Sequence, residues 1–174
     1  MIVGERLLTG HRGFAGEVGH IVLQVNGPAC SCGRRGCAEA LVGLRAMLRT
    51  SVAADARCPP LAEVQRLLAA HDADTLRAIE KAGRFLGVPL QNLAAAYDPG
   101  CIVLGGSLVD LGDVFLQPAL QTLDDCAAAA SLAPPTVQTS RFGAGAVAVG
   151  AAALARQRLT RPLIAPGFGG RAIA

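Results

Sequence analysis

The chain has 174 residues, of which 52% are hydrophobic and 3% aromatic, and its formal net charge is +3. This length and apolar content allow one globular unit with a core of ordinary size. The few aromatic rings and the mild, scattered positive charge exclude a surface built to stack bases or to follow a phosphate backbone. We therefore expect no direct contact between this chain and nucleic acid.

The apolar stretches are all short. Arg, Asp, Gly or Pro interrupts each one before it reaches the roughly 20 residues that a membrane-spanning helix needs. The first residues also lack the basic and apolar segments of a secretory signal. We expect a cytoplasmic protein with no membrane partner. Its six cysteines would stay reduced there, so a cluster of them favours a metal site over disulfides.

Short strands and helices are predicted in the first part of the chain. Residues 2–8 resemble two strands around a tight turn, and strands so close to the start suggest that the chain begins inside a sheet. Residues 21–25 are rich in β-branched side chains and predict another strand, which the turn residues 26–28 end. Helices are predicted at about 38–49 and 61–70.

A long amphipathic segment follows these elements. Asp74 can cap its N-terminus, and apolar side chains recur on one face as far as Tyr97. A kink is expected at residues 87–89, which are Gly-Val-Pro, and the segment stops at the Asp-Pro-Gly of residues 98–100. The sequence therefore predicts one long helix with a bend.

The last part of the chain alternates between strand and helix patterns. The predicted elements are a strand at 101–104, a helix at about 114–130, a strand at 136–139 and a helix at about 147–156. This order predicts an α/β lobe over residues 1–156. Residues 157–174 are rich in Pro and Gly and predict an extended tail.

A cysteine-rich loop carries the strongest chemical signal. It has the pattern C-x-C-G-x-x-G-C-x-E over residues 30–39 and follows the pattern G-E-x-G-H over residues 16–20. Three thiolates and one imidazole suit a tetrahedral zinc ion that leaves no open position, so the metal would be structural. A cluster of buried cysteines, or a disulfide in oxidised protein, is the alternative. The expected ligands are His20, Cys30, Cys32 and Cys37.

These two patterns resemble the ROK family of sugar kinases and sugar-responsive repressors. The resemblance extends through residues 82–87, 98–99 and 102–106, so it covers residues 1 to about 156. It implies an actin-like (ribonuclease H-like) ATPase-superfamily lobe with a zinc-binding loop, and a homo-oligomer, a dimer or tetramer, that pairs through helices. It also implies a sugar ligand whose hydroxyls bond to Glu17, His20 and Glu39. As isolated residues, the two glutamates would be read as surface carboxylates.

The resemblance leaves three functions open. We favour the sugar-sensing effector lobe of a repressor, which would bind DNA through an N-terminal domain absent from this sequence. The connector between Glu39 and residue 82 is short, and residues 40–43 read Ala-Leu-Val-Gly where family kinases commonly show an aromatic residue and Ser-Gly. The alternatives are the C-terminal lobe of a glucokinase-like sugar kinase, and a truncated fragment without independent activity.

Nucleotide chemistry is expected only in the kinase alternative. Gly105 and Gly106 resemble the turn that approaches the adenosine of ATP, but repressors of the family keep a similar turn. Family kinases also have a phosphate loop and a catalytic Asp, and neither occurs in this sequence. We therefore expect no catalysis by this chain alone, and a role for ATP with Mg²⁺ only if the full protein is a kinase.

Overall fold

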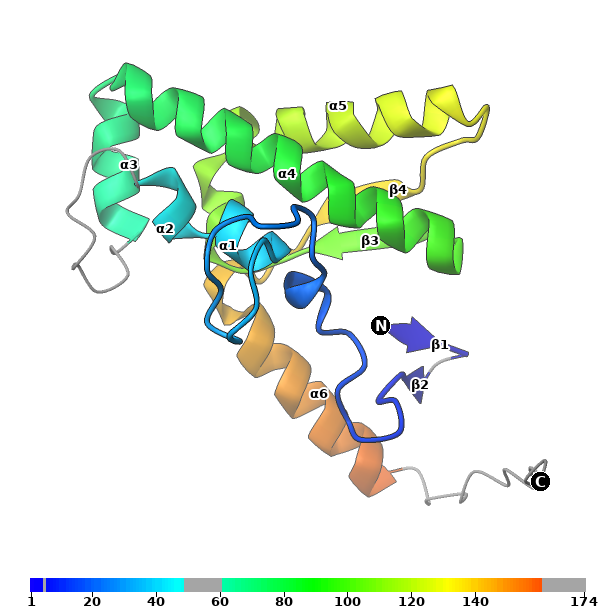
Figure 1. Cartoon of the computed structure of the whole chain (residues 1–174). Coiled ribbons are helices and arrows are strands. Elements are labelled where there is room, and N and C mark those ends of the chain that lie inside the picture. Colours follow the sequence, from blue (N-terminus) through cyan, green and yellow to red (C-terminus); the bar gives the residue numbers. More distant parts are fainter. Residues whose placement is uncertain (5, 49–60, 161–174) are drawn as a thin grey trace.

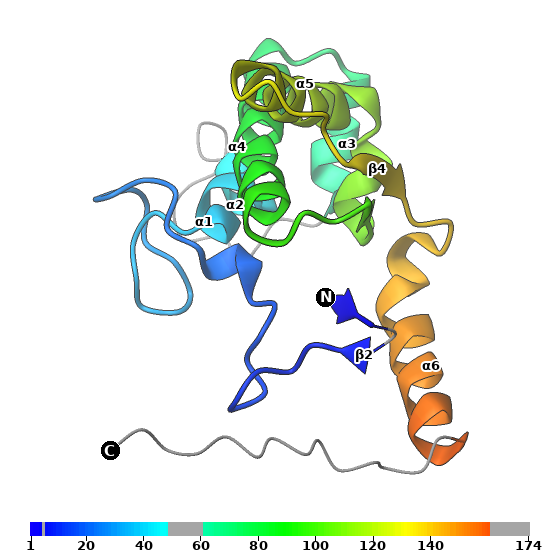
Figure 2. The ribbon, with the colours of Figure 1, turned by 90° about the vertical axis from the view of Figure 1, so that its right-hand side faces the viewer.

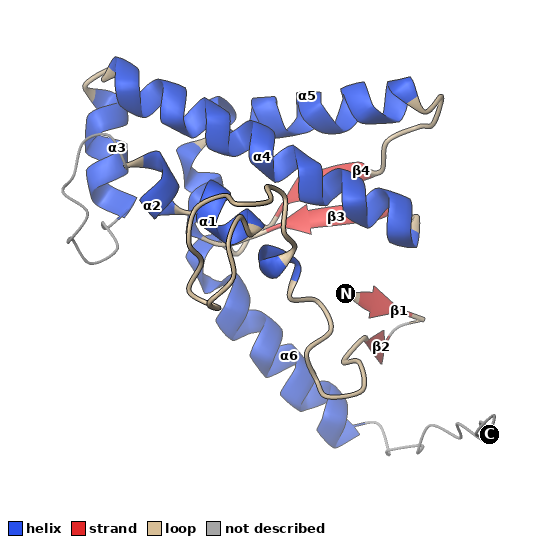
Figure 3. Cartoon of the chain, viewed as in Figure 1, coloured by secondary structure: helices blue, strands red, loops and turns tan. Residues whose placement is uncertain are grey.

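The computed structural model describes residues 1–4, 6–48 and 61–160. Helices predominate in these ranges, and the strands are short (Figure 3). The two longest helices, α4 (Ala73–Tyr97) and α5 (Asp113–Ala129), lie side by side (Figure 1). None of the described helices is both long enough and apolar enough to cross a membrane.

A two-stranded parallel sheet lies against these two helices. Strand β3 (Cys101–Leu104) pairs with β4 (Thr136–Thr139), so both predicted strands are confirmed. One face of the sheet packs on α4 and α5, while Val103 on the other face is 61% exposed. The packed side chains are Ile102, Leu104 and Val137 from the sheet and Leu90, Ala119 and Leu123 from the helices.

The close approach of α4 and α5 depends on two glycines one helical turn apart. A Cβ atom added to Gly83 would lie 2.3 Å from the Phe115 carbonyl oxygen, and one added to Gly87 would lie 2.4 Å from the Thr122 Cβ. Such distances are far inside van der Waals contact. The α4 backbone therefore packs directly against α5 at these two positions, which no other residue type could allow.

The long helix predicted from the sequence is confirmed as one element, α4, and the bend expected at residues 87–89 stays a prediction. The helix runs without interruption through Pro89, which is buried. Proline removes one backbone donor, but the glycine contacts with α5 and the burial of the surrounding turn hold the helical path. Tertiary packing therefore overrides the local breaking signal.

The N-terminal cap of α4 is Asp72, not Asp74 as the sequence suggested. The Asp72 Oδ1 atom accepts a hydrogen bond of 2.8 Å from the Thr75 backbone N–H, the geometry of an N-cap. Asp74 lies in the first turn instead, where its carboxylate pairs with Arg77. Both aspartates suit a helix start, and α4 begins at Ala73, directly after Asp72.

We expect Asp72→Ala to lower the thermal midpoint by a few degrees at pH 7, because an orphaned helix N–H loses its acceptor. The hydroxyl and the backbone N–H of Thr75 lower the pKa of Asp72 below its usual value of 3.8. The stabilisation should thus be complete above pH 3.8 and disappear as the pH falls through the lower, folded-state value.

Circular dichroism melts of the wild type and Asp72→Ala at pH 7 and at about pH 2 would test this, with Asp74→Ala as the matched control. A difference in midpoint that stays the same at both pH values would contradict the capping role of the ionised Asp72 carboxylate.

The main core lies where the shorter helices meet α4 and α5. Helix α3 (Leu61–Ala69) confirms the predicted helix at 61–70, whereas the helix predicted at 38–49 is broken at Gly43 into α1 (Ala38–Val42) and α2 (Leu44–Met47). Contacts join all of them to α4. The fully buried members of this core include Met47, Val64, Ile79 and Phe115.

The two ends of the described chain lie on the other side of the sheet. Strands β1 (Ile2–Val3) and β2 (Arg6–Leu7) form the expected hairpin, with Ile2 opposite Leu7. Figures 1 and 2 both place this hairpin and α6 (Ala146–Thr160) away from α4 and α5. Helix α6 continues past Arg156, so residues 157–160, which were expected in the tail, are helical, and the rest of the tail lies outside the described residues.

The strand predicted at residues 21–25 is wrong. This segment is a series of bends in which Val22 alone makes a β-bridge, and its partner is Cys37. The Gly36 carbonyl accepts hydrogen bonds from two successive amides, Leu23 at 2.8 Å and Gln24 at 3.2 Å. Two neighbouring N–H groups that turn to one acceptor cannot alternate as a ladder requires, so the β-branched composition does not produce a strand.

Candidate metal centre

The cysteine loop is folded back on itself by its own backbone. The Cys30 N–H donates to the Arg34 carbonyl at 2.8 Å, the Gly33 N–H donates to the Cys30 carbonyl at 3.1 Å, and Ala29 and Arg35 form a β-bridge. Gly33 has φ of +85°, in the left-handed region that glycine adopts without strain. The resulting tight turn keeps Cys30 and Cys32 on one short loop.

Gly36 brings the third cysteine back to the start of the loop. Its φ is +71°, and an added Cβ would lie 1.7 Å from the Gln24 carbonyl oxygen. This contact explains why the second glycine of the motif is needed. The next residue, Cys37, is fully buried, bridges Val22 and precedes the first residue of α1.

The fourth residue of the cluster comes from a separate element. His20 ends a short 3-10 helix, η1 (Val18–His20), which contacts α1. The ligand atoms of the four predicted residues, the imidazole nitrogen and the three sulfurs, all lie within 4.8 Å of one another. The structure therefore assembles His20, Cys30, Cys32 and Cys37 into one group that could hold a metal ion.

Two interatomic distances test how well this group fits zinc. A tetrahedron with Zn–S bonds of about 2.3 Å and Zn–N bonds of about 2.0–2.1 Å has S–S edges of about 3.8 Å and S–N edges of about 3.6 Å. The Cys32 and Cys37 Sγ atoms are 3.7 Å apart, and the Cys30 Sγ and His20 Nδ1 atoms are 3.6 Å apart. These two of the six edges agree with a tetrahedral ion of this size, and the other four are no longer than 4.8 Å.

The thiols differ in how readily they lose a proton. Hydrogen bonds from Arg34, first from its backbone and then from its side chain, lower the pKa of Cys32 to about 6. Burial raises the pKa of Cys37 to about 11. Cys32 thus offers a thiolate at neutral pH, whereas the Cys37 thiol needs a bound metal to displace its proton.

The structure also brings together the three residues expected to bind a sugar. A Glu17 Oε2 atom lies 3.9 Å from the His20 Nε2 atom, and a Glu39 Oε2 atom lies 4.0 Å from the His20 Nδ1 atom. Both carboxylates are more than half exposed, with side-chain values of 64% and 52%. Two open acceptors thus flank the imidazole of a candidate metal ligand, an arrangement that suits donors such as hydroxyl groups.

Sequence reasoning missed one polar residue of this cluster. The Ser31 hydroxyl donates a hydrogen bond of 2.9 Å to the Glu39 Oε1 atom. Ser31 is the variable position of the C-x-C pair, so the motif itself carried no signal for it. Its place beside two metal-binding candidates was the only available hint.

The predicted nucleotide residues lie elsewhere in the fold. Gly105 and Gly106 directly follow β3, and the Ser140 N–H donates to the Leu104 carbonyl at 2.6 Å, so the ends of β3 and β4 stay joined there. Gly106 has φ of +97°, and an added Cβ would meet nothing within 4 Å. The backbone at Gly106 is thus open to an approaching ligand.

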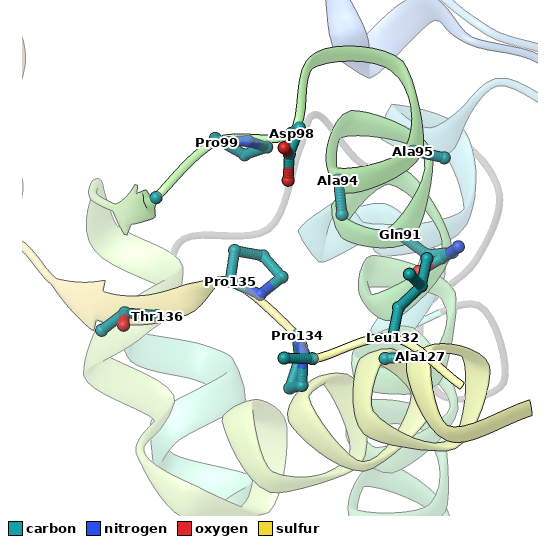
Figure 4. Close-up of a pocket in the computed structure, with 12 residues that line it drawn as sticks. Gln91, Ala94, Ala95, Asp98, Pro99, Ala127, Leu132, Pro134, Pro135 and Thr136 are labelled. Atoms are coloured by element: carbon teal, nitrogen blue, oxygen red, sulfur yellow. The ribbon is translucent and has the colours of Figure 1, made fainter. Parts of the chain in front are cut away.

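A separate pocket lies at the amino ends of β3 and β4, opposite to the end where Gly105 and Gly106 lie. Gly100 and Thr136, at the starts of β3 and β4, line a cavity of about 300 Å³ together with the C-terminal parts of α4 and α5 (Figure 4). None of its lining residues belongs to the cysteine loop or to residues 17–20. In open α/β sheets, ligands bind outside the carboxyl ends of the strands, so this pocket is on the less usual side.

Comparison with curated proteins finds a regulator among the relatives. The xylose repressor of Bacillus spizizenii is 34% identical over 110 residues, which make up 63% of this chain and 28% of the repressor. The matched part is thus less than a third of that protein.

Comparison with solved structures finds sugar kinases. A ROK hexokinase from Thermus thermophilus superimposes with a TM-score of 0.79 at 35% identity. The match covers 92% of this chain and 54% of the hexokinase. A ROK family glucokinase from Streptomyces griseus, in complex with glucose and AMPPNP, has a TM-score of 0.75 at 26% identity and covers 90% and 56%. The chain therefore spans about half the length of these structures and has the actin-like ATPase fold of ROK sugar kinases.

The model of the ROK family matches residues 1–158, almost the whole described chain and close to the extent predicted from the sequence patterns. Its members include repressors and kinases, and both kinds stand among the proteins compared above. The extent of this match shows that the chain belongs to the ROK family.

Proposed function

We propose that the chain is a sugar-binding lobe in which structural zinc shapes a site for a hexose-type ligand. The observation that carries this proposal is the position of Glu17 and Glu39 on either side of the imidazole of His20. The glucose complex of the related Streptomyces griseus glucokinase supports a sugar as the ligand class.

Zinc held by the three cysteines and His20 would make the cysteine loop rigid. With three thiolates and one imidazole as ligands, it would use the His20 Nδ1 atom, which lies nearest the Cys30 sulfur. The proton of the neutral imidazole would then be on Nε2, facing Glu17. The site would thus combine one N–H donor with two carboxylate acceptors, and a polyol is recognised by pairing its hydroxyls with such groups.

Within the family, we propose that the lobe is the sugar-sensing effector part of a transcriptional repressor. The similarity to the xylose repressor supports this proposal. The kinase alternative rests on two other observations: the likeness to the two sugar kinases, and the open backbone of Gly106 at the carboxyl end of β3.

We expect Glu39→Ala to weaken hexose binding by about tenfold or more, because a charged acceptor for a sugar hydroxyl is removed. Isothermal titration of zinc-loaded protein with a panel of hexoses would measure this. Asp124→Ala, which removes an exposed carboxylate on α5, is the matched control and should bind like the wild type. A hexose bound equally by wild type and Glu39→Ala would show that the site is placed wrongly.

A second titration, with AMPPNP, distinguishes between the two proposed family functions. AMPPNP binding by the chain would favour the kinase alternative, because a nucleotide site is needed for phosphoryl transfer. Hexose binding without AMPPNP binding would favour the repressor only when the full-length protein is titrated, because the phosphate loop of family kinases does not occur in this sequence. ATP with Mg²⁺ enters the proposal only in the first case.

Self-association also stays a proposal. Large apolar side chains are exposed on the side of the sheet that α4 and α5 leave open, among them Ile2, Val3, Val103 and Val147. A contiguous exposed apolar patch is typical of a protein-protein contact. A dimer or tetramer of the full protein would give this surface a partner.

A further inference from the structure

Ser31 links the candidate metal loop to one of the candidate sugar residues. Its hydroxyl donates to the Glu39 Oε1 atom at 2.9 Å, while the other carboxylate oxygen, Oε2, lies 4.0 Å from the His20 Nδ1 atom. One oxygen of Glu39 is therefore bonded to the loop, and the second faces the imidazole. This division leaves Oε2 available to a ligand donor.

The backbone of Ser31 is held by its neighbours. The residue lies between Cys30 and Cys32, inside the turn that the Cys30 to Arg34 hydrogen bond closes. A metal bound by both flanking cysteines would fix this turn further. The direction of the Ser31 hydroxyl, and through it the orientation of Glu39, would then depend on metal loading.

The Ser31 hydroxyl also stabilises the negative charge of Glu39. A zinc ion with three thiolates has a net charge of −1, because +2 and −3 sum to −1. Glu17 and Glu39 place two further negative charges beside this centre. A neutral donor on Glu39 Oε1 stabilises the carboxylate without using up the oxygen that faces the imidazole.

We propose that Ser31 is a positioning residue that orients Glu39 for a sugar hydroxyl and couples zinc loading to sugar affinity. This inference rests on the proposed function of the site. Ser31→Ala should keep zinc at the wild-type stoichiometry and lose about three- to tenfold in hexose affinity. Ser31→Thr, which retains the hydroxyl, should restore most of the affinity.

The experiment uses zinc-loaded full chain, elemental analysis for the metal, and calorimetry with the hexose that binds the wild type best. On the Glu39→Ala background, Ser31→Ala should have no further effect, because the group that it orients is gone. Carbon-13 NMR of the Glu39 carboxyl without sugar gives a second readout, with a signal that moves in Ser31→Ala and returns in Ser31→Thr.

The outcomes separate the two levels of the proposal. If Glu39→Ala weakens binding but Ser31→Ala binds like the wild type, the positioning role is overturned and the sugar site stands. A loss of zinc in Ser31→Ala would also overturn it, since the role would then be structural. Unchanged binding in Glu39→Ala, or no hexose binding by the wild type, would overturn both.

Discussion

Replacing Cys32 by serine should lower the thermal midpoint by about 10 °C or more, because structural zinc contributes directly to folding. Cys32 is exposed, so the substitution itself buries no polar group. The loss would extend beyond the loop, since Cys37, which shares the metal group, is buried against the start of α1. Differential scanning calorimetry of freshly reduced protein would measure the change.

Two comparisons separate metal loss from a simple change of side chain. Cys101→Ser alters an exposed cysteine on β3 outside the cluster and should leave the midpoint within a degree or two of the wild type. Chelation of the wild type should reproduce the Cys32→Ser result. Reduced protein that holds no stoichiometric zinc, or a midpoint that chelation does not change, would rule out a structural metal.

Changing Gly83 to alanine should destabilise the chain by about 1–3 kcal/mol, although alanine is the better helix former. The added methyl group would lie 2.3 Å from the Phe115 carbonyl oxygen, which is backbone and cannot rotate away. Helices α4 and α5 would have to separate, and Phe115 is a fully buried core residue. Urea unfolding followed by circular dichroism would give the free energy.

Gly150→Ala is the matched control for this prediction. Gly150 also lies inside a helix, α6, but a Cβ there would meet nothing within 4 Å. The same substitution should therefore stabilise α6 by up to about 1 kcal/mol. Equal effects of the two variants would show that α4 and α5 do not pack through Gly83.

Most helices and strands of the second half could be predicted because their signals are local. The apolar run at 101–104 predicts a strand, and the turn residues 98–100 predict the end of a helix. The close packing of α4 on α5 through Gly83 and Gly87 could not be predicted, because the residues that the glycines meet are distant in sequence. Local propensity predicts helix packing poorly when a contact between two backbones determines it.

The candidate site shows the same division between motif and context. The cysteine pattern and the preceding G-E-x-G-H pattern were enough to name the four candidate ligands, and the structure brings all four together. The motif also indicated Glu17 and Glu39, but only coordinates show which imidazole nitrogen each one faces. Ser31 lay at a position where the motif accepts any residue, so its bond to Glu39 was invisible to sequence reasoning.

The small parallel sheet has one further consequence. Among the described residues, β3 and β4 pair only with each other, so each strand has a free edge of unpaired amides and carbonyls. Parallel strands are normally covered on both faces, whereas Val103 faces outward here. An exposed strand edge can template the addition of a strand from another molecule. Contacts of that kind extend from chain to chain without closing, unlike a symmetric dimer, so this edge is where open-ended aggregation of the isolated lobe would begin.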